Sequence, residues 1–168
     1  MTKPLVSIGL PVWNGEKYLA CAITSILEQS FEDFELLIAD NASTDRTAEI
    51  AREFCAKDPR VRYVRHASNI GAAGNFNYVF HETTGRYFKW AAYDDMLAPD
   101  FLAETTAALE KDRAGRAALA YPQTLLIDQE GAPLRPLVKT HPETGRKTLT
   151  IGRHAHAIPG LSKTESEE

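Results

Sequence analysis

The feature that most constrains this chain is a regular alternation of short apolar runs with longer amphipathic segments. The apolar runs occupy residues 4–12, 34–40, 60–66 and 86–93, and a last one lies between residues 116 and 134. Each is bounded by proline, glycine or polar residues and is short enough for a buried strand. The alternation therefore predicts a sheet whose strands are separated along the chain by other elements.

The segments between these runs carry apolar residues at helical spacing. The first contains Leu19, Ile23 and Ile26, and the second contains Ile50 and Phe54. Such spacing is typical of helices with one buried face. Strands that alternate with helices through short connections indicate an α/β fold, with a mostly parallel sheet flanked by helices on both faces.

Length and composition suit one soluble globular domain. The chain has 168 residues, 43% of them hydrophobic, and a formal charge of −4. We predict one folded domain over residues 1–133 and an irregular, partly disordered tail over residues 134–168, where apolar residues are sparse. The negative charge argues against a nucleic-acid partner. Cys21 and Cys55 lie in predicted helices, so we expect buried thiols and no disulfide.

No segment of the sequence is typical of membrane insertion or secretion. No apolar run approaches the roughly 20 residues that a spanning helix needs. The first residues do not form a charged start followed by a long apolar stretch. We therefore expect no transmembrane segment and a cytoplasmic location, with peripheral attachment to the inner face of the membrane left open.

Polar side chains follow three of the predicted strands. Asn14 comes after the first strand, Asp40 and Asn41 end the second, and Asp94 and Asp95 follow the fourth. Ligands of such sheets gather at the carboxyl ends of the strands. We expect these side chains to form one site.

The adjacent acids Asp94 and Asp95 favour a cation. Mg²⁺ and Mn²⁺ take oxygen ligands, commonly one or two carboxylates plus substrate phosphates. The alternative is that one acid caps the following helix. Pro99 suits the first turn of that helix, which places the cap near Ala98 and leaves the second acid unexplained.

Three segments resemble, in order, the successive signatures of glycosyltransferase family 2, whose members use nucleotide sugars and have the GT-A fold. They are VSIGLPVWNGEKYL, IADNASTDRT and NIGAAGNFNYVFHETTGRYFKWAAYDD. The likeness runs from about Val6 to Leu102 and implies that residues 1–133 form a nucleotide-sugar-binding GT-A domain. Other nucleotide-binding folds fit less well, because the loop after the first strand lacks both an Arg-rich phosphate loop and the G-x-G-x-x-G pattern.

The resemblance also implies site residues. Asp95 would bind the metal, Mn²⁺ or Mg²⁺, and Asp94 would share it or contact the ribose. Asp40 would recognise the base or ribose. The full set of implied nucleotide-sugar-binding residues is Pro11, Val12, Trp13, Asn14, Asp40, Asn41, Asn69, Gly71, Asn75 and Asp94. Family members usually have Asp at position 41 and often Arg at position 74, where this chain has Asn41 and Gly74.

The implied activity is metal-assisted transfer of a sugar, with inversion, from a nucleoside diphosphate to an acceptor hydroxyl. A carbohydrate or lipid-linked acceptor is expected, as in polysaccharide biosynthesis. No residue matches the family's general base: Asp128 and Glu130 come too early, and Glu143 fits no motif. We therefore expect a chain without the acceptor part. Such a chain would rely on another polypeptide or associate with itself. The alternative is a truncated or non-catalytic nucleotide-sugar-binding module.

Overall fold

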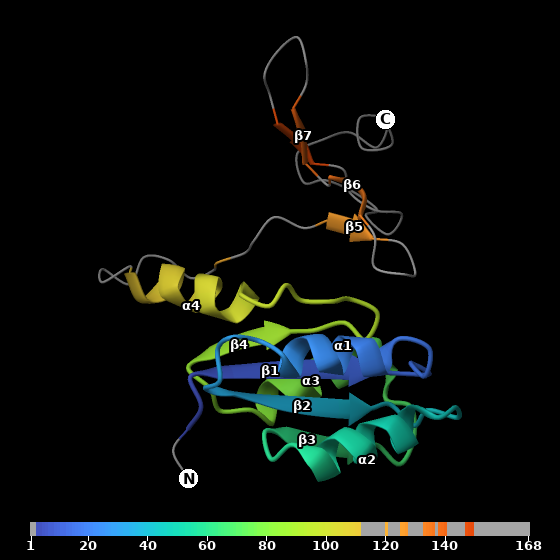
Figure 1. Ribbon diagram of the computed structural model, residues 1–168. Helices are drawn as coiled ribbons and strands as arrows, with labels where there is room; N and C mark the ends of the chain where they lie inside the picture. The colour runs from blue at the N-terminus through green and yellow to red at the C-terminus, as the bar shows by residue number, and fades with distance from the viewer. Residues whose placement is uncertain are drawn as a thin grey trace. The chain divides into compact units, whose positions relative to one another are not determined.

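The computed structural model describes residues 3–111 and Ala120, and the short strands at residues 125–127, 133–136, 138–140 and 147–149 (Figure 1). The chain divides into two compact units, residues 1–120 and 121–168, and each is described by itself. Within the described residues, no helix has the length and apolar character needed to cross a membrane.

The first unit contains a four-stranded parallel sheet. Its strands are β1 (Val6–Val12), β2 (Phe34–Asp40), β3 (Val61–Arg65) and β4 (Tyr87–Trp90). Their spatial order is β3-β2-β1-β4, so the first strand along the chain lies inside the sheet. All neighbouring pairs are parallel, and the arrows in Figure 1 point the same way.

Helices cover both faces of this sheet, as the sequence predicts. They are α1 (Leu19–Leu27), α2 (Thr47–Lys57), α3 (Gly71–His81) and α4 (Phe101–Lys111). Buried residues of α1, α2 and α4 share one cluster, while Val79 of α3 packs on the other face with Leu37. Right-handed crossovers explain this division. The chain moves in one direction from β1 to β3, which places α1 and α2 on one face, and it then moves back past β1 to form β4, which places α3 on the other face.

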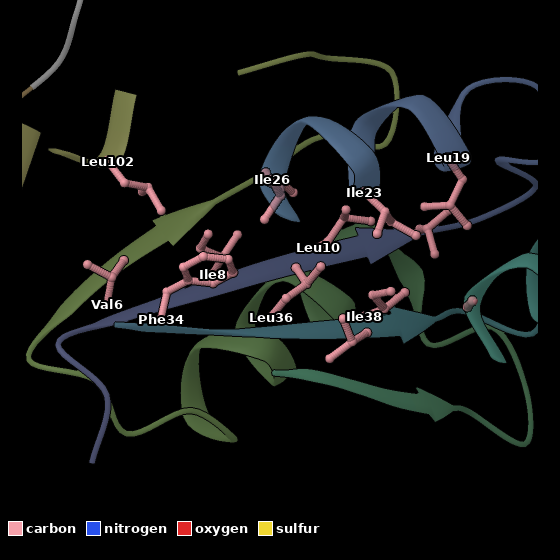
Figure 2. Packing of buried hydrophobic residues seen from close by; sticks show 14 residues of the cluster. Val6, Ile8, Leu10, Leu19, Ile23, Ile26, Phe34, Leu36, Ile38 and Leu102 are labelled. Atoms are coloured by element: carbon pink, nitrogen blue, oxygen red, sulfur yellow. The ribbon is translucent and has the colours of Figure 1, made fainter. Parts of the chain in front are cut away.

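The core follows the two-residue period of the strands. Ile8 and Leu10 of β1 point toward α1, where Figure 2 shows them near Ile23 and Ile26. The intervening positions of β1 point toward α3. Gly9 is one of them, and a Cβ atom there would lie 2.6 Å from the Val79 side chain. The missing side chain lets α3 approach the middle of the sheet.

The second unit contains two short antiparallel strand pairs. They are β5 (Leu125–Ile127) with β6 (Pro133–Pro136), and β7 (Val138–Thr140) with β8 (Lys147–Leu149). The division between units falls after Ala120. The predicted tail over residues 134–168 lies mostly outside the described residues.

The expectation that both cysteines are buried is wrong. Cys21 and Cys55 are exposed and free. The buried face of α1 comprises Leu19, Ala22, Ser25 and their neighbours at helical spacing, and it leaves position 21 facing solvent. No disulfide joins Cys21 and Cys55 in the structure.

Candidate functional site

The carboxyl ends of the strands meet where the strand order reverses. The chain runs from β1 outward to β3 and then crosses to β4 on the other side of β1. Ligands of open α/β sheets bind in the crevice outside such a switch point. The loops after β1, β2 and β4 are therefore where a site is expected.

The loops after β1 and β2 are tied together by hydrogen bonds. The Asn14 N–H donates to Ser43 Oγ at 2.9 Å, and the Thr44 N–H donates to Asn14 Oδ1 at 2.9 Å. The Gly15 N–H donates to Thr47 Oγ1 at 2.8 Å. Asn14 has a φ of 51°, a left-handed conformation that asparagine tolerates better than most residues. Ser43 and Thr44, which precede α2 in the chain, support this loop.

Asp40 lies beneath these loops with no exposed surface. Its Oδ1 accepts the Ser43 N–H at 2.8 Å, and its Oδ2 accepts the Tyr63 hydroxyl at 2.8 Å. Arg65 Nε lies 3.6 Å from Oδ2. Burial, followed by the hydrogen bond to Asp40, raises the pKa of Tyr63 to about 12. A ligand would reach this carboxylate only by displacing one of these partners.

The Asn41 side chain joins the end of β2 to the start of α3. Its Nδ2 donates to Asn69 Oδ1 at 2.9 Å and to the Gly71 carbonyl at 3.3 Å. Its Oδ1 accepts the Ile70 N–H at 2.8 Å. Gly71 has a φ of +80°, which favours glycine at this position. Asn41 thus fixes the loop that the sequence predicts to pass near the nucleotide.

Asn75 anchors the same helix from below. It is buried, and its Nδ2 donates to the Ala39 carbonyl at 2.8 Å. Its Oδ1 lies 2.9 Å from His66 Nε2. Its contacts are therefore with β2 and with the residue after β3.

Exposure separates the predicted site residues into two groups. The first group is buried. It comprises Pro11 and Val12 of β1, Asp40 and Asn41 at the end of β2, and Asn75 of α3. The exposed members of the predicted set are Trp13, Asn14, Asn69, Gly71, Asp94 and Asp95. Trp13 is 54% exposed directly after the central strand. The buried group holds the loops, and the exposed group is free to contact a ligand.

Asp94 and Asp95 are exposed in the loop between β4 and α4. Partial burial raises the pKa of Asp95, and the neighbouring charge of Asp94 raises it further, while Lys89 opposes the rise. Burial lowers the pKa of Lys89, and Asp95 acts against that shift. Helix α4 begins at Phe101, and its Leu102 N–H donates to Gln29 Oε1, so neither acid caps it.

These two carboxylates suit a divalent cation that a ligand helps to hold. Partial burial beside a second carboxylate disfavours the charged form of Asp95, and a cation would relieve that repulsion. Among the described residues, no group of three or more His, Cys, Asp or Glu side chains comes together as a metal cage. Mg²⁺ is commonly held by one or two carboxylates and substrate phosphates.

Sequence reasoning missed Tyr63, Arg65, Thr47 and Lys89. The first two act on Asp40 from β3, and Thr47 supports Gly15 from the first turn of α2. Lys89 lies on β4, before the acidic pair. A lysine within an otherwise apolar strand indicates a nearby negative charge, so the sequence did contain a signal for this residue. Among the described residues we assign no general base, and Asp128, Glu130 and Glu143 lie outside them.

Residues 7–159 match the family described as glycosyl transferase family 2. An uncharacterized glycosyltransferase of Haemophilus influenzae is 31% identical over 166 residues, which cover 99% of this chain and 65% of that protein. A protein of Delftia acidovorans named (S)-phenoxypropionate/alpha-ketoglutarate-dioxygenase is 48% identical over 88 residues, but the match covers 44% of this chain and 30% of that protein. The chain thus spans between 30% and 65% of the length of these two relatives.

Solved structures show the same fold. The mannosyltransferase PcManGT from Pyrobaculum calidifontis, in complex with GDP-Man and Mn2+, has a TM-score of 0.59 at 24% identity over 65% of this chain and 33% of that chain. S. aureus TarS 1-349 in complex with UDP-GlcNAc has a TM-score of 0.60 at 23% identity over 74% of this chain and 38% of that chain. The predicted GT-A architecture is confirmed. With a family match over most of its length, the chain belongs to glycosyl transferase family 2.

Proposed function

We propose that this protein binds a nucleoside-diphosphate sugar together with Mn²⁺ or Mg²⁺ and takes part in transferring the sugar to an acceptor hydroxyl. The observation that carries the proposal is the pair of exposed, adjacent carboxylates, Asp94 and Asp95, at the switch point of a GT-A sheet. The structures of the same fold solved with GDP-Man and Mn2+ and with UDP-GlcNAc support this ligand class.

The loops after β1, β2 and β3 would take the nucleoside. Trp13 offers an exposed aromatic ring on which a base can stack, and Asn14 and Asn69 offer polar groups at the same edge. Asp40 and Asn41 would act from below, by fixing the backbone of these loops. The predicted direct contact between Asp40 and a base or ribose would require exchange of its present partners.

The acidic pair would take the diphosphate end. A bound cation would stabilise the negative charge on the departing nucleoside diphosphate as a Lewis acid. Asp95, with Asp94 beside it, would hold that cation at the edge of the sheet. Lys89 lowers the net negative charge around the pair and so limits their mutual repulsion.

Transfer also needs an acceptor and a general base. Inversion requires attack from the face opposite the leaving group, with a base close to the attacking hydroxyl. We propose a carbohydrate or lipid-linked acceptor and place its site outside the described residues. The predicted cytoplasmic location stays a prediction. So does self-association, for which the exposed aromatic side chains Phe76, Phe80 and Trp90 form the surface to test.

Calorimetric titration with UDP and GDP, with and without Mn²⁺, tests the binding part. Mn²⁺ should tighten binding of one nucleotide by about 10-fold or more in the natural protein. Asp95→Asn should remove that gain. Loss of a metal-binding carboxylate should lower metal affinity by more than the 10–100-fold that is typical when only the groups around metal ligands are changed. Asp33→Asn, an exposed acid just before β2 at the other end of the sheet, is the matched control and should bind as the natural protein does. Equal binding with and without Mn²⁺, or no binding at all, contradicts the proposal.

A product assay with a panel of nucleotide sugars then separates an enzyme from a binding module. Transfer, or donor hydrolysis that depends on Asp95, indicates an enzyme. Metal-dependent binding without either reaction indicates the non-catalytic module.

A further inference from the structure

The acidic pair has little hydrogen bonding of its own. We call residues 91–100, between β4 and α4, the acidic loop. Within the described residues, the only backbone hydrogen bond of Asp94 or Asp95 joins the Asp95 N–H to the Ala92 carbonyl at 3.4 Å. That distance is longer than an ordinary N–H···O bond. Tyr93 and Leu97, on either side of the pair, pack against the apolar core. The other backbone hydrogen bonds that hold the loop lie at its two ends.

One end is held by the sheet. The Ala91 N–H donates to the Gly9 carbonyl at 2.8 Å, which continues the pairing of β4 with β1. Beyond Ala91 the chain leaves the sheet and turns. This anchor fixes where the loop begins but not where it goes.

The other end is held by α1 and the residues that follow it. Ser25 Oγ accepts the Leu97 N–H at 3.1 Å and donates to the Ala22 carbonyl at 2.8 Å. The Ser30 N–H donates to the Pro99 carbonyl at 2.8 Å. Ser25 is 7% exposed, and its hydrogen bond to Ala22 is buried while the one from Leu97 is partly buried.

Gln29 connects the same region to both the loop and α4. Its Nε2 donates to the Ala98 carbonyl at 2.6 Å and to the Ser25 carbonyl at 3.0 Å. Its Oε1 accepts the Leu102 N–H at 2.9 Å, one of the free N–H groups in the first turn of α4. The side chain is 5% exposed. Its amide is thus used from both ends and bridges three elements.

We propose that Ser25 and Gln29 are positioning residues for the acidic pair: from α1 and the turn that follows it, they hold the acidic loop so that Asp94 and Asp95 stay together at the edge of the sheet. This inference rests on the function proposed above. Two like charges on a loop with few hydrogen bonds of its own would move apart if one end were released. Both residues are buried, so their effect would pass through the loop.

The physical consequence is a loss of preorganisation. Groups that orient metal ligands typically change metal affinity by about 10–100-fold when they are removed. Ser25 and Gln29 act through the backbone, so we expect the lower end of this range, about 10-fold. Nucleotide binding without metal should change little, because it depends on the loops after β1, β2 and β3.

Ser25→Ala and Ser7→Ala form a matched pair for the test. Ser7 is also buried and has two hydrogen bonds, to Glu35 Oε1 and from the Gly85 N–H, but it lies toward the amino end of β1. We would measure Mn²⁺ affinity at saturating UDP or GDP, whichever binds, and nucleotide affinity in EDTA. Ser25→Ala should weaken Mn²⁺ binding several-fold with unchanged nucleotide affinity in EDTA. Ser7→Ala should leave both unchanged.

Gln29→Ala provides the second variant, with a readout that needs no metal. Amide hydrogen exchange at Leu97 and Leu102 should become faster, and Mn²⁺ affinity should fall about 10-fold. Unchanged Mn²⁺ affinity in both variants, with the natural protein binding Mn²⁺ normally, overturns the positioning role alone. Equal losses in Ser7→Ala and Ser25→Ala overturn it too, because they indicate a general loss of stability. A natural protein that binds no Mn²⁺ overturns the proposed function first.

Discussion

Two aspartates at the same edge of the sheet, Asp40 and Asp95, lie in opposite surroundings. Asp40 ends β2, has no exposed surface, and accepts hydrogen bonds from Ser43 and Tyr63. Asp95 follows β4, is exposed, and has another carboxylate as its neighbour in sequence. Both strands flank β1, so the difference comes from the loops.

The difference indicates a division of labour within the edge. The loops after β1, β2 and β3 are already fixed by internal hydrogen bonds and can present a preformed surface to a nucleoside. The acidic loop brings two carboxylates together, Lys89 offsets their charge only in part, and hydrogen bonds hold the loop at its ends. It is suited to a cation, whose binding removes the repulsion that the free protein tolerates.

The sharpest way to break this comparison is to remove the charge of its buried member, Asp40. Asp40→Asn should lower the free energy of unfolding by about 2–3 kcal/mol, because a buried charged acceptor loses its charge while its donors remain. Urea unfolding would measure the change. Asp33→Asn, an exposed acid, should stay within about 0.5 kcal/mol of the natural protein. A comparably small effect of Asp40→Asn would show that Asp40 does not fix the loops after β1, β2 and β3.

A smaller effect is expected at Asn41. Asn41→Asp should cost about 1–2 kcal/mol, because its Nδ2 donates to Asn69 Oδ1 and to the Gly71 carbonyl, and a carboxylate would face these two acceptors. The loss should shrink at acidic pH, where the new side chain takes up a proton. Asn77→Asp, an exposed change on α3, is the control in the same unfolding assay. An equally stable Asn41→Asp variant would mean that the family's usual Asp fits this loop without rearrangement.

Much of this fold could be predicted from the sequence, because strand and helix periods are local. The apolar alternation in Val6–Val12 and the spacing of Leu19, Ile23 and Ile26 each report a buried face without any knowledge of the partner. The position of Asp94 and Asp95 at the edge also followed from their place after a strand.

The burial of Asp40 and Asn41 could not be predicted in the same way. Their partners, Tyr63 and Ile70, lie more than 20 residues away in sequence, at 23 and 29 positions. No local pattern says that a polar residue at a strand end will find buried donors there. The role of Gln29 is hidden for the same reason, since Ala98 and Leu102 lie 69 and 73 positions away.

The smallest expected effect concerns Asp95 in the metal-free protein. Burial and Asp94 raise its pKa, so the folded state binds a proton more readily than the unfolded chain does. The free energy of unfolding therefore falls as pH rises from the ordinary aspartate range through the raised value, and ionised Asp95 destabilises the fold at neutral pH. Asp95→Asn should then be more stable than the natural protein at pH 7 in EDTA. The gain should stay below about 1 kcal/mol, because solvent screens an exposed charge.

That small gain should reverse when the ligand is added. A nucleoside diphosphate with Mn²⁺ at 100 times its dissociation constant stabilises the folded state by about 2.7 kcal/mol, and Asp95→Asn should lose the metal-dependent share. Thermal unfolding of both proteins, in EDTA and in Mn²⁺ with nucleotide, would show the two orders. If the same protein is the more stable one in both conditions, the distinction between the hydrogen-bonded loops after β1, β2 and β3 and the acidic loop is removed. A reversal means that Asp95 is retained at a cost to the empty protein because it contributes to the bound one.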